Sequence, residues 1–255
     1  IERHSGNINN ISVYGQDSNP TTWKMAQMNL AIRGIEANLG SYNADTFFND
    51  CHPTMRADFI MANPPFNLKG WYDENLKDDA RWADYRTPPE SNANYAWILH
   101  MLSHLKPLDG VAGFLLANGA LGDSDTADIR EQLIKNDKVE AIIILPRELF
   151  ITTDISVTLW ILNQNKKGGE YHGRTLRNRE NEILFMDLRT WTENPVKNEG
   201  KKKEDKNSPF FLLINVFYKN KYKYLYFIIQ QCNKNYYYII NKILIFVIFN
   251  IELKL

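Results

Sequence analysis

The residues with the clearest chemical potential are Asn63-Pro64-Pro65-Phe66, which directly follow the apolar segment 58–62. The Asn63 side-chain oxygen and the Pro64 carbonyl can both accept hydrogen bonds from the amino group of a planar base, whose lone pair is otherwise delocalised into the ring. The two prolines hold these acceptors rigidly, and Phe66 can stack on a base that has left the duplex. Two such acceptors would bias the nitrogen toward a pyramidal, nucleophilic form, and a methyl donor with a sulfonium leaving group would then need no strong base. The alternative is a Pro-Pro turn in which Phe66 is core packing.

The elements that must position this motif alternate along the chain. Apolar segments predict strands at 11–14, 58–62, 111–117, 139–145 and 155–162, and helical spacing predicts helices from Pro20 to about Gly34, at 94–106 and at 128–135. Asn19 is a candidate helix cap. Such alternation predicts an α/β fold, a mostly parallel sheet with helices on both faces. Because ligands bind at the carboxyl ends of such strands, the turns after Tyr14, around Asp45 and after Ala62 are expected along one edge.

Composition excludes several classes of protein. A chain of 255 residues with no net charge and a pI of about 7.1 is not a strongly basic nucleic-acid coat, although a local basic groove remains possible. A mean hydropathy of −0.42 excludes a polytopic membrane protein. The two cysteines, Cys51 and Cys232, cannot form a disulfide framework, so we expect a reducing, cytoplasmic location. The opening residues lack an initiator Met and a signal peptide, and we expect the chain to be part of a longer protein.

The composition changes sharply near residue 208. Residues 208–255 consist almost wholly of Ile, Tyr, Lys, Asn, Phe and Leu and show no steady period, and we interpret them as a low-complexity, non-native tail. One alternative is an aggregation-prone or partner-bound β segment. The other is a membrane anchor at 236–251, which Asn241, Lys242 and Asn250 interrupt. The charged run 201–206 before the tail is typical of a solvated linker.

The motif and its flanking segments together resemble the methylation (M) subunit of type I restriction–modification systems. The resemblance covers about residues 11–190 and is carried, besides the motif, by Tyr14-Gly15-Gln16-Asp17, the segment 28–35 (MNLAIRGI), Ala44-Asp45-Thr46-Phe47, the segment 145–150 (LPRELF) and the segment 153–162 (TDISVTLWIL). It implies transfer of a methyl group from S-adenosylmethionine to N6 of adenine in DNA. It also implies a specificity (S) subunit, a restriction (R) subunit and DNA as partners, and no membrane.

The resemblance assigns roles to individual residues. Asn63, Pro64, Pro65 and Phe66 would be catalytic, and no metal is expected. Asp17 would accept the cofactor's ribose hydroxyls, as acidic residues do in dinucleotide folds; the alternative is an ordinary capping turn. Asp45 would accept a hydrogen bond from the cofactor's adenine amino group, with Phe47 as a packing neighbour; the alternative is a surface turn.

One family feature is missing from the sequence. The family carries a glycine-rich turn of the type Asp-Pro-x-x-Gly-x-Gly after a central first strand, and no such turn is found. The resemblance therefore implies a partial Rossmann-like methyltransferase sheet at 1–165, whose central first strand is missing, followed at 166–207 by the edge of the domain and the linker. Loss of that strand would leave both neighbouring strands with unpaired edges. We expect the chain alone to bind S-adenosylmethionine poorly and to turn over little.

Two other functions are compatible with the sequence. The chain can be an inactive remnant that only docks to a specificity subunit. Alternatively, since Asn-Pro-Pro-aromatic motifs also serve other amines, it can methylate cytosine N4 or protein glutamine.

Three other groups of residues carry weaker signals. His100 and His104 are four residues apart, a spacing that can hold a metal, but a solvated helix face is the preferred interpretation. Cys51-His52 is interpreted as a loop and not as a nucleophilic pair. The loop after the motif mixes aromatic and basic residues, which suits a flap that contacts the target base and phosphate, although its acidic residues weaken this reading; the residues are Lys69, Trp71, Lys77, Arg81, Trp82, Tyr85 and Arg86.

Overall fold

The computed structural model describes residues 11–145, 155–171 and 174–189, and the backbone of 224–229. Its helices are α1 (Pro20–Ile32), α2 (Asn94–His104) and α3 (Ala127–Lys135), and its strands are β1 (Ser12–Gln16), β2 (Ala37–Asn38), β3 (Phe59–Asn63), β4 (Val111–Ala117), β5 (Val139–Ile144), β6 (Val157–Asn163), β7 (Gly169–Tyr171), β8 (Arg174–Leu176), β9 (Leu184–Asp187) and β10 (Tyr224–Ile229). Short 3-10 turns lie at Glu74–Leu76, Ala80–Trp82, Asn118–Leu121 and Ser124–Thr126. The predicted α/β class is confirmed.

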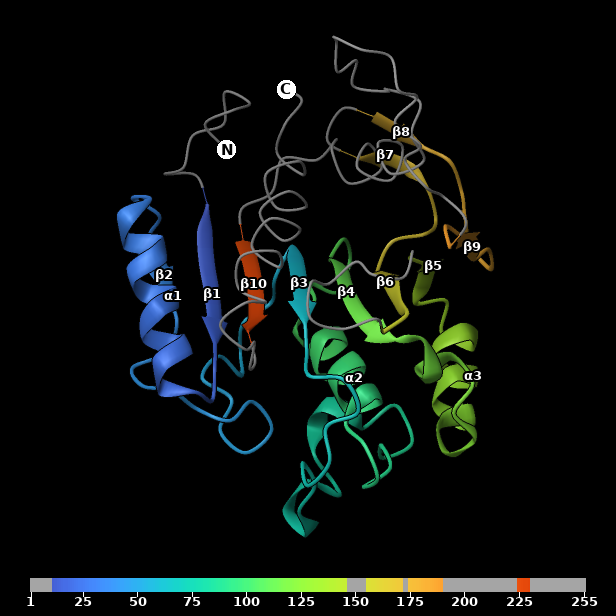
Figure 1. Ribbon diagram of the computed structural model, residues 1–255. Helices are drawn as coiled ribbons and strands as arrows, with labels where there is room; N and C mark the ends of the chain where they lie inside the picture. Colours follow the sequence, from blue (N-terminus) through green and yellow to red (C-terminus); the bar gives the residue numbers. More distant parts are fainter. Residues whose placement is uncertain (1–10, 146–154, 172–173, 190–223, 230–255) are drawn as a thin grey trace, which may run out of the picture.

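The main sheet has the strand order β2-β1-β10-β3-β4-β6-β5-β9, while β7 and β8 form a separate hairpin (Figure 1). The strands from β2 to β4 are parallel, as predicted. The expectation of a mostly parallel sheet is confirmed, with the exception of β6, which runs antiparallel to both β4 and β5, whereas β5 and β9 are again parallel. The connection from β5 to β6 lies mostly outside the described residues, and the two strands pair directly as antiparallel neighbours.

The place between β1 and β3 is occupied by β10. This strand comes from the far end of the chain and is parallel to both neighbours (Figure 1). The expectation that both neighbours have unpaired edges is therefore wrong. The rest of the tail, including the suggested anchor at 236–251, and the linker at 201–206 lie outside the described residues.

Within the described ranges, no helix combines the length and the apolar character needed to cross a membrane.

Local signals define α1 as the sequence predicts. The Asn19 side chain accepts hydrogen bonds from the backbone N–H groups of Thr21 and Thr22, at 2.9 and 3.2 Å, and Pro20 begins the helix. Gly34, with φ of +65°, follows the last turn, a backbone conformation that glycine adopts without steric cost.

Two apolar clusters cover the two faces of the sheet, because successive side chains of a strand point to opposite faces. Phe114 and Leu116 of β4 belong to a large cluster that includes most of α2 and the inner face of α3, whereas Leu115 belongs to a smaller one. The smaller cluster also contains Ala141, Ile143, Leu145, Val157, Ile161 and Leu188. α2 is buried along almost its whole length, so it is a rigid support beneath β3 and β4.

Candidate functional site

The predicted catalytic motif begins at the last residue of β3, at the carboxyl edge of the sheet. Strand register places Asn63 beside Ile229 of β10, and Gln16 of β1 beside Ile228. Asp17, one residue further along, is therefore level with Asn63 with one strand between them. Two strand spacings of about 4.8 Å separate these backbones by roughly 10 Å. The fold thus brings together two predicted site residues that are 46 positions apart in the sequence.

Asn63 meets the chemical requirement of its predicted role. Its side-chain oxygen Oδ1 is buried and has no hydrogen-bond partner among the described residues. Pro64 is buried, Pro65 is half-buried, and Phe66 is half-buried against the smaller apolar cluster. A buried acceptor without a partner costs free energy unless a ligand satisfies it, so this oxygen is placed to accept a hydrogen bond from a bound amine.

Asp17 is also buried, with only 1% of its surface exposed. Its Oδ1 accepts a hydrogen bond from the backbone N–H of Asn19 at 2.7 Å, so the capping turn that was the alternative reading does form. Its Oδ2 is buried without a hydrogen-bond partner in the described ranges. Burial raises the pKa of Asp17 to about 7, although the Asn19 N–H opposes the shift. The carboxyl group can therefore both cap the turn and accept a hydroxyl donor through its second oxygen.

The Asp45 loop is tied directly to the Asp17 turn. The N–H of Ala44 donates to the Asp17 carbonyl at 3.0 Å. Gln16, which the sequence analysis did not single out, holds the same loop: its Nε2 donates to the carbonyls of Ala44 and Asn49, and its Oε1 accepts from the N–H of Cys51 at 2.8 Å. A buried amide at the last position of a strand is the signal that could have identified it.

Asp45 and Phe47 have different surroundings. Asp45 is half-buried, and its Oδ1 accepts hydrogen bonds from the N–H groups of Phe47 and Phe48, so the predicted turn is present. The Phe47 ring is buried, with 3% exposure, and packs against Trp71 and Trp97 at centroid distances of 4.9 and 4.2 Å. Phe47 thus supports the loop from inside the core, and its contact with a cofactor stays a prediction.

Two more buried oxygens lie at this edge of the sheet. Asn118 follows β4 and Ser156 precedes β6, and the Asn118 N–H donates to the Ser156 carbonyl at 3.0 Å. Asn118 Oδ1 and Ser156 Oγ are buried without a hydrogen-bond partner in the part of the chain that the structure describes. We call Asp17 Oδ2, Asn63 Oδ1, Asn118 Oδ1 and Ser156 Oγ the open oxygens. Sequence reasoning missed the last two, because a polar residue beside a strand is common.

Similar buried groups elsewhere do not follow the same pattern. Thr46 Oγ1, Trp97 Nε1 and Asp109 Oδ1 are also buried without a partner within the described residues. They lie in a loop, inside α2 and ahead of β4. The open oxygens differ in that all four come from residues at a strand end on one edge, where ligands bind in open α/β sheets.

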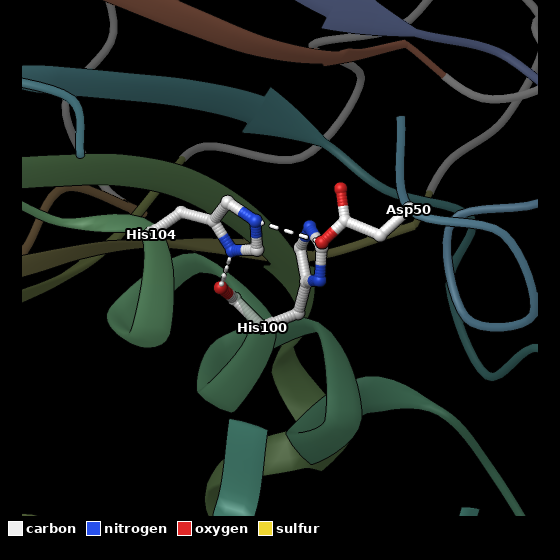
Figure 2. Close-up of side chains that lie close together, drawn as sticks. All are labelled: Asp50, His100 and His104. Atoms are coloured by element: carbon white, nitrogen blue, oxygen red, sulfur yellow. Dashed lines mark hydrogen bonds and ion pairs between the residues drawn. The ribbon is translucent and has the colours of Figure 1, made fainter. Parts of the chain in front are cut away.

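A second polar group lies on α2, and here the prediction of a solvated helix face is wrong. His100 and His104 are 0% and 2% exposed. Figure 2 shows their rings beside Asp50, which comes from the loop before β3. His104 Nε2 lies 2.8 Å from Asp50 Oδ2, and His104 Nδ1 lies 2.9 Å from the His100 carbonyl. Burial raises the pKa of Asp50, but the hydrogen bond and charge of His104 outweigh it, so the net shift is downward.

Arg81 determines which nitrogen of His100 carries the proton, and therefore whether His100 can bind a metal. Its guanidinium lies 3.2 Å from His100 Nδ1 and pairs with Asp79 at 2.7 Å, and it donates to the carbonyls of Thr46 and Phe47. Burial, with the nearby charges of His104 and Arg81, lowers the pKa of His100 well below its ordinary value. A neutral His100 that accepts from Arg81 carries its proton on Nε2, which removes that nitrogen as a metal ligand. We call Asp50, Asp79, Arg81, His100 and His104 the paired cluster, and its geometry fits a structural role.

The same contacts overturn the predicted flap. Trp71 and Trp82 are each 2% exposed and belong to the large apolar cluster. Arg81 is engaged in the paired cluster, and Arg86 pairs with Asp128. The loop after the motif therefore folds onto the core instead of presenting its aromatic rings to a base.

Cys51 and His52 lie in a loop, as predicted. Burial, together with the nearby Asp50 carboxylate, raises the pKa of the Cys51 thiol, which disfavours the thiolate. His52 is buried, and its Nε2 lies 3.0 Å from the Gly15 carbonyl. A nucleophilic role for this pair has no support in the geometry.

The fold is a mixed α/β sheet with the Asn63 motif at its carboxyl edge, and sequence comparison gives the family. The family model described as N-6 DNA Methylase matches residues 1–228, and the chain belongs to this family. It is 49% identical over 191 residues to the HindI methylase subunit of a type I restriction enzyme from Haemophilus influenzae, covering 74% of this chain and 40% of that protein. It is 40% identical over 175 residues to the MjaIX methylase subunit from Methanocaldococcus jannaschii, covering 65% of this chain and 30% of that protein. The chain thus spans well under half the length of these relatives.

Solved structures agree on the fold. The methyltransferase subunit of a type I restriction–modification system from Streptococcus thermophilus superimposes with a TM-score of 0.61 at 23% identity, covering 75% of this chain and 44% of that one. A protein from Listeria monocytogenes whose structure is described under an assignment as a class I S-adenosylmethionine-dependent methyltransferase gives a TM-score of 0.52 at 18% identity, covering 69% of this chain and 58% of that one.

Proposed function

We propose that this chain carries the methyl-acceptor site of an N6-adenine DNA methyltransferase that works within a type I restriction–modification complex. The observation that carries the proposal is the buried, open oxygen of Asn63, level with Asp17 at the carboxyl edge of the sheet. Membership of the N-6 DNA Methylase family and the similarity to type I methylase subunits support it.

The acceptor base is held by the motif. Asn63 Oδ1 and the Pro64 carbonyl accept hydrogen bonds from the two hydrogens of the exocyclic amine, which turns the nitrogen lone pair out of the ring plane and aims it. Phe66 is half-buried and packs against the smaller apolar cluster, and we assign it the stacking contact with the base. Both prolines restrict the backbone, so the acceptors are preorganised before the base arrives.

The cofactor part of the site fits S-adenosylmethionine in part. Asp17 Oδ2 is a buried carboxylate oxygen able to accept from a ribose hydroxyl, and the Asp45 loop is bonded to the same turn. When bound, this cofactor supplies an electrophilic methyl group on a positively charged sulfur. The glycine-rich turn that would surround its methionine part is not found in the sequence.

The partners follow from the same family. We propose that DNA is the substrate and that a specificity subunit supplies sequence recognition, with a restriction subunit in the complete complex. The relatives that support this are named as methylase subunits of type I restriction enzymes.

The test is a single-turnover assay on the full chain, with protein in excess over DNA and S-adenosylmethionine at high concentration. Digested DNA is analysed by mass spectrometry for methylated nucleosides. We expect N6-methyldeoxyadenosine with the wild-type chain and a loss of about 100-fold or more with Asn63→Ala, while calorimetric titration shows unchanged cofactor affinity.

Other outcomes separate the alternatives. N4-methyldeoxycytidine, or methylated glutamine in a protein substrate, would assign a different amine to the same motif. Binding to a specificity subunit without any methyl transfer would indicate an inactive remnant. Transfer that survives Asn63→Ala at the wild-type rate would contradict the mechanism.

A further inference from the structure

The segment that leaves the motif makes an unusual turn. Asn67, directly after Phe66, has a φ of +52°, in the left-handed region that favours glycine and that asparagine tolerates better than most residues. Its N–H donates to Asn94 Oδ1 at 3.0 Å, and Asn94 Nδ2 donates back to Asn67 Oδ1 at 2.8 Å. We call this reciprocal pair the amide clasp. A non-glycine residue in this conformation is held there by its surroundings, and the clasp supplies those bonds.

Asn94 uses its side chain for the motif loop and not for its own helix. It is the first residue of α2, and its backbone N–H donates to Asn92 Oδ1 at 3.1 Å. The capping residue, Ala93, makes no side-chain cap; its own N–H donates to the Leu68 carbonyl at 2.9 Å. Both Ala93 and Asn94 thus bond to the two residues that follow the motif.

The support behind the clasp is rigid. Asn94 is 2% exposed, and the residues after it in α2, from Tyr95 to Met101, are all fully buried. Close packing leaves such a helix little freedom to shift. The motif is therefore fixed at its start by β3 and at its end by the clasp, so the directions of the Pro64 carbonyl and the Phe66 ring between them are determined.

We propose that Asn94 is a positioning residue for methyl transfer: through Asn67 it sets the orientation of the Asn63–Phe66 acceptor motif. The inference rests on the proposed function. Asn94 does not touch the amine; it acts by holding the tip of the motif where both acceptors meet the amine and Phe66 meets the ring. A displacement of about 1 Å at such a tip is enough to lower the rate by about 100-fold.

The experiment compares variants of the full chain in the single-turnover assay, at temperatures where each is fully folded by circular dichroism. Asn94→Ala removes both hydrogen bonds of the clasp, whereas Asn67→Gly removes only the one to Asn67 Oδ1, keeps the backbone N–H donor and tolerates the positive φ. Asn94→Asp keeps an acceptor for the Asn67 N–H and loses the donor. Asn75→Ala is the matched control, because Asn75 is an exposed asparagine whose hydrogen bonds are confined to a local turn with Asp73.

We expect Asn94→Ala to lower the rate at saturating cofactor by about 10- to 100-fold, with cofactor affinity unchanged and Asn75→Ala at the wild-type rate. Asn94→Asp should recover part of the loss. The double variant with Asn67→Gly should be no slower than Asn94→Ala alone, since Asn94→Ala already removes both hydrogen bonds of the clasp.

Two results would overturn the inference: a wild-type rate for Asn94→Ala, or losses in the double variant that multiply as independent effects. A wild-type chain that transfers no methyl group to DNA would overturn the proposed function itself, and the inference with it. If the wild-type chain transfers methyl groups, Asn63→Ala does not, and Asn94→Ala does so at the wild-type rate, then the inference about Asn94 fails while the proposed function stands.

Discussion

Two groups of buried polar residues differ in whether their polar atoms have hydrogen-bond or ion-pair partners. In the paired cluster on and around α2, Asp50 faces His104, and Arg81 faces Asp79 and His100. At the carboxyl edge of the sheet, the open oxygens of Asp17, Asn63, Asn118 and Ser156 are buried without such partners in the described ranges. A buried polar group that is paired stabilises its surroundings, and one that is unpaired costs free energy until a ligand satisfies it. Burial alone therefore does not identify a binding site; a buried polar atom that lacks a hydrogen-bond partner does.

The largest effect on the free energy of unfolding is expected from a substitution in the paired cluster. Asp50→Ala removes the carboxylate and leaves His104 buried without it, so we expect a loss of about 3 kcal/mol in the free energy of unfolding. Because the pKa of Asp50 is lowered on folding from 3.8, this contribution is complete above about pH 4 and is lost as the pH falls below it. Urea unfolding of both chains measures it. Asp50→Asn keeps an acceptor but loses the charge, so it should recover only part of the loss; wild-type stability of Asp50→Asn would refute the ion pair.

Arg81 should show a smaller loss. Arg81→Lys keeps the charge but cannot reproduce the two-pronged contact with Asp79 while also donating to the Thr46 and Phe47 carbonyls. We expect a decrease of about 1–3 kcal/mol in the free energy of unfolding, measured by the same denaturation. Lys135→Arg, on an exposed helix face, is the control. An unchanged midpoint for Arg81→Lys would mean that the cluster does not depend on the guanidinium.

The stability contribution of Asp17 should change in the opposite direction, with a loss that builds up as the pH rises from about 4 to about 7 and is complete above that range. Its pKa rises from 3.8 to about 7 on folding, so the native state binds more protons than the unfolded state in that range and stability falls as the pH rises through it. Asp17→Asn cannot ionise and escapes this penalty. We expect the variant to be more stable than wild type near pH 8 and closer to it near pH 5, by thermal unfolding at both. A difference independent of pH would contradict the shifted carboxyl.

The smallest effects on stability are expected at the remaining open oxygens. Asn63→Ala and Asn118→Ala each delete a buried acceptor that has no partner among the described residues, so little favourable interaction is lost. We expect changes of no more than about 1 kcal/mol in the free energy of unfolding. A loss as large as that of Asp50→Ala would show that these oxygens are structural, and would remove the contrast between the two regions.

Local rules gave several elements correctly. Asn19, Pro20 and Gly34 define the ends of α1 as predicted, because capping and left-handed conformations depend on a few adjacent residues. The motif was expected at the carboxyl end of a buried strand and is found there. Asp17 could be placed near it because both follow strands of one parallel sheet.

Long-range packing decided what local patterns could not. His100 and His104 have the spacing of a helix surface, but α2 is covered on nearly all sides and the histidines are buried. Trp71 and Trp82 follow the motif among charged residues, as a flap would, yet they pack in the core. The position of β10 between β1 and β3 depends on two open strand edges far away in the sequence.

The sequence by itself determined the α/β class, the motif at a strand end and the chemistry that Asn63 and its prolines offer, since residue type and spacing carry that information. Only the tertiary structure decided which polar groups satisfy one another and which stay open, and that Asn94, 31 positions from Asn63, holds the end of the motif. The reason is physical: a hydrogen bond requires donor and acceptor at contact distance, and only folding brings distant residues that close.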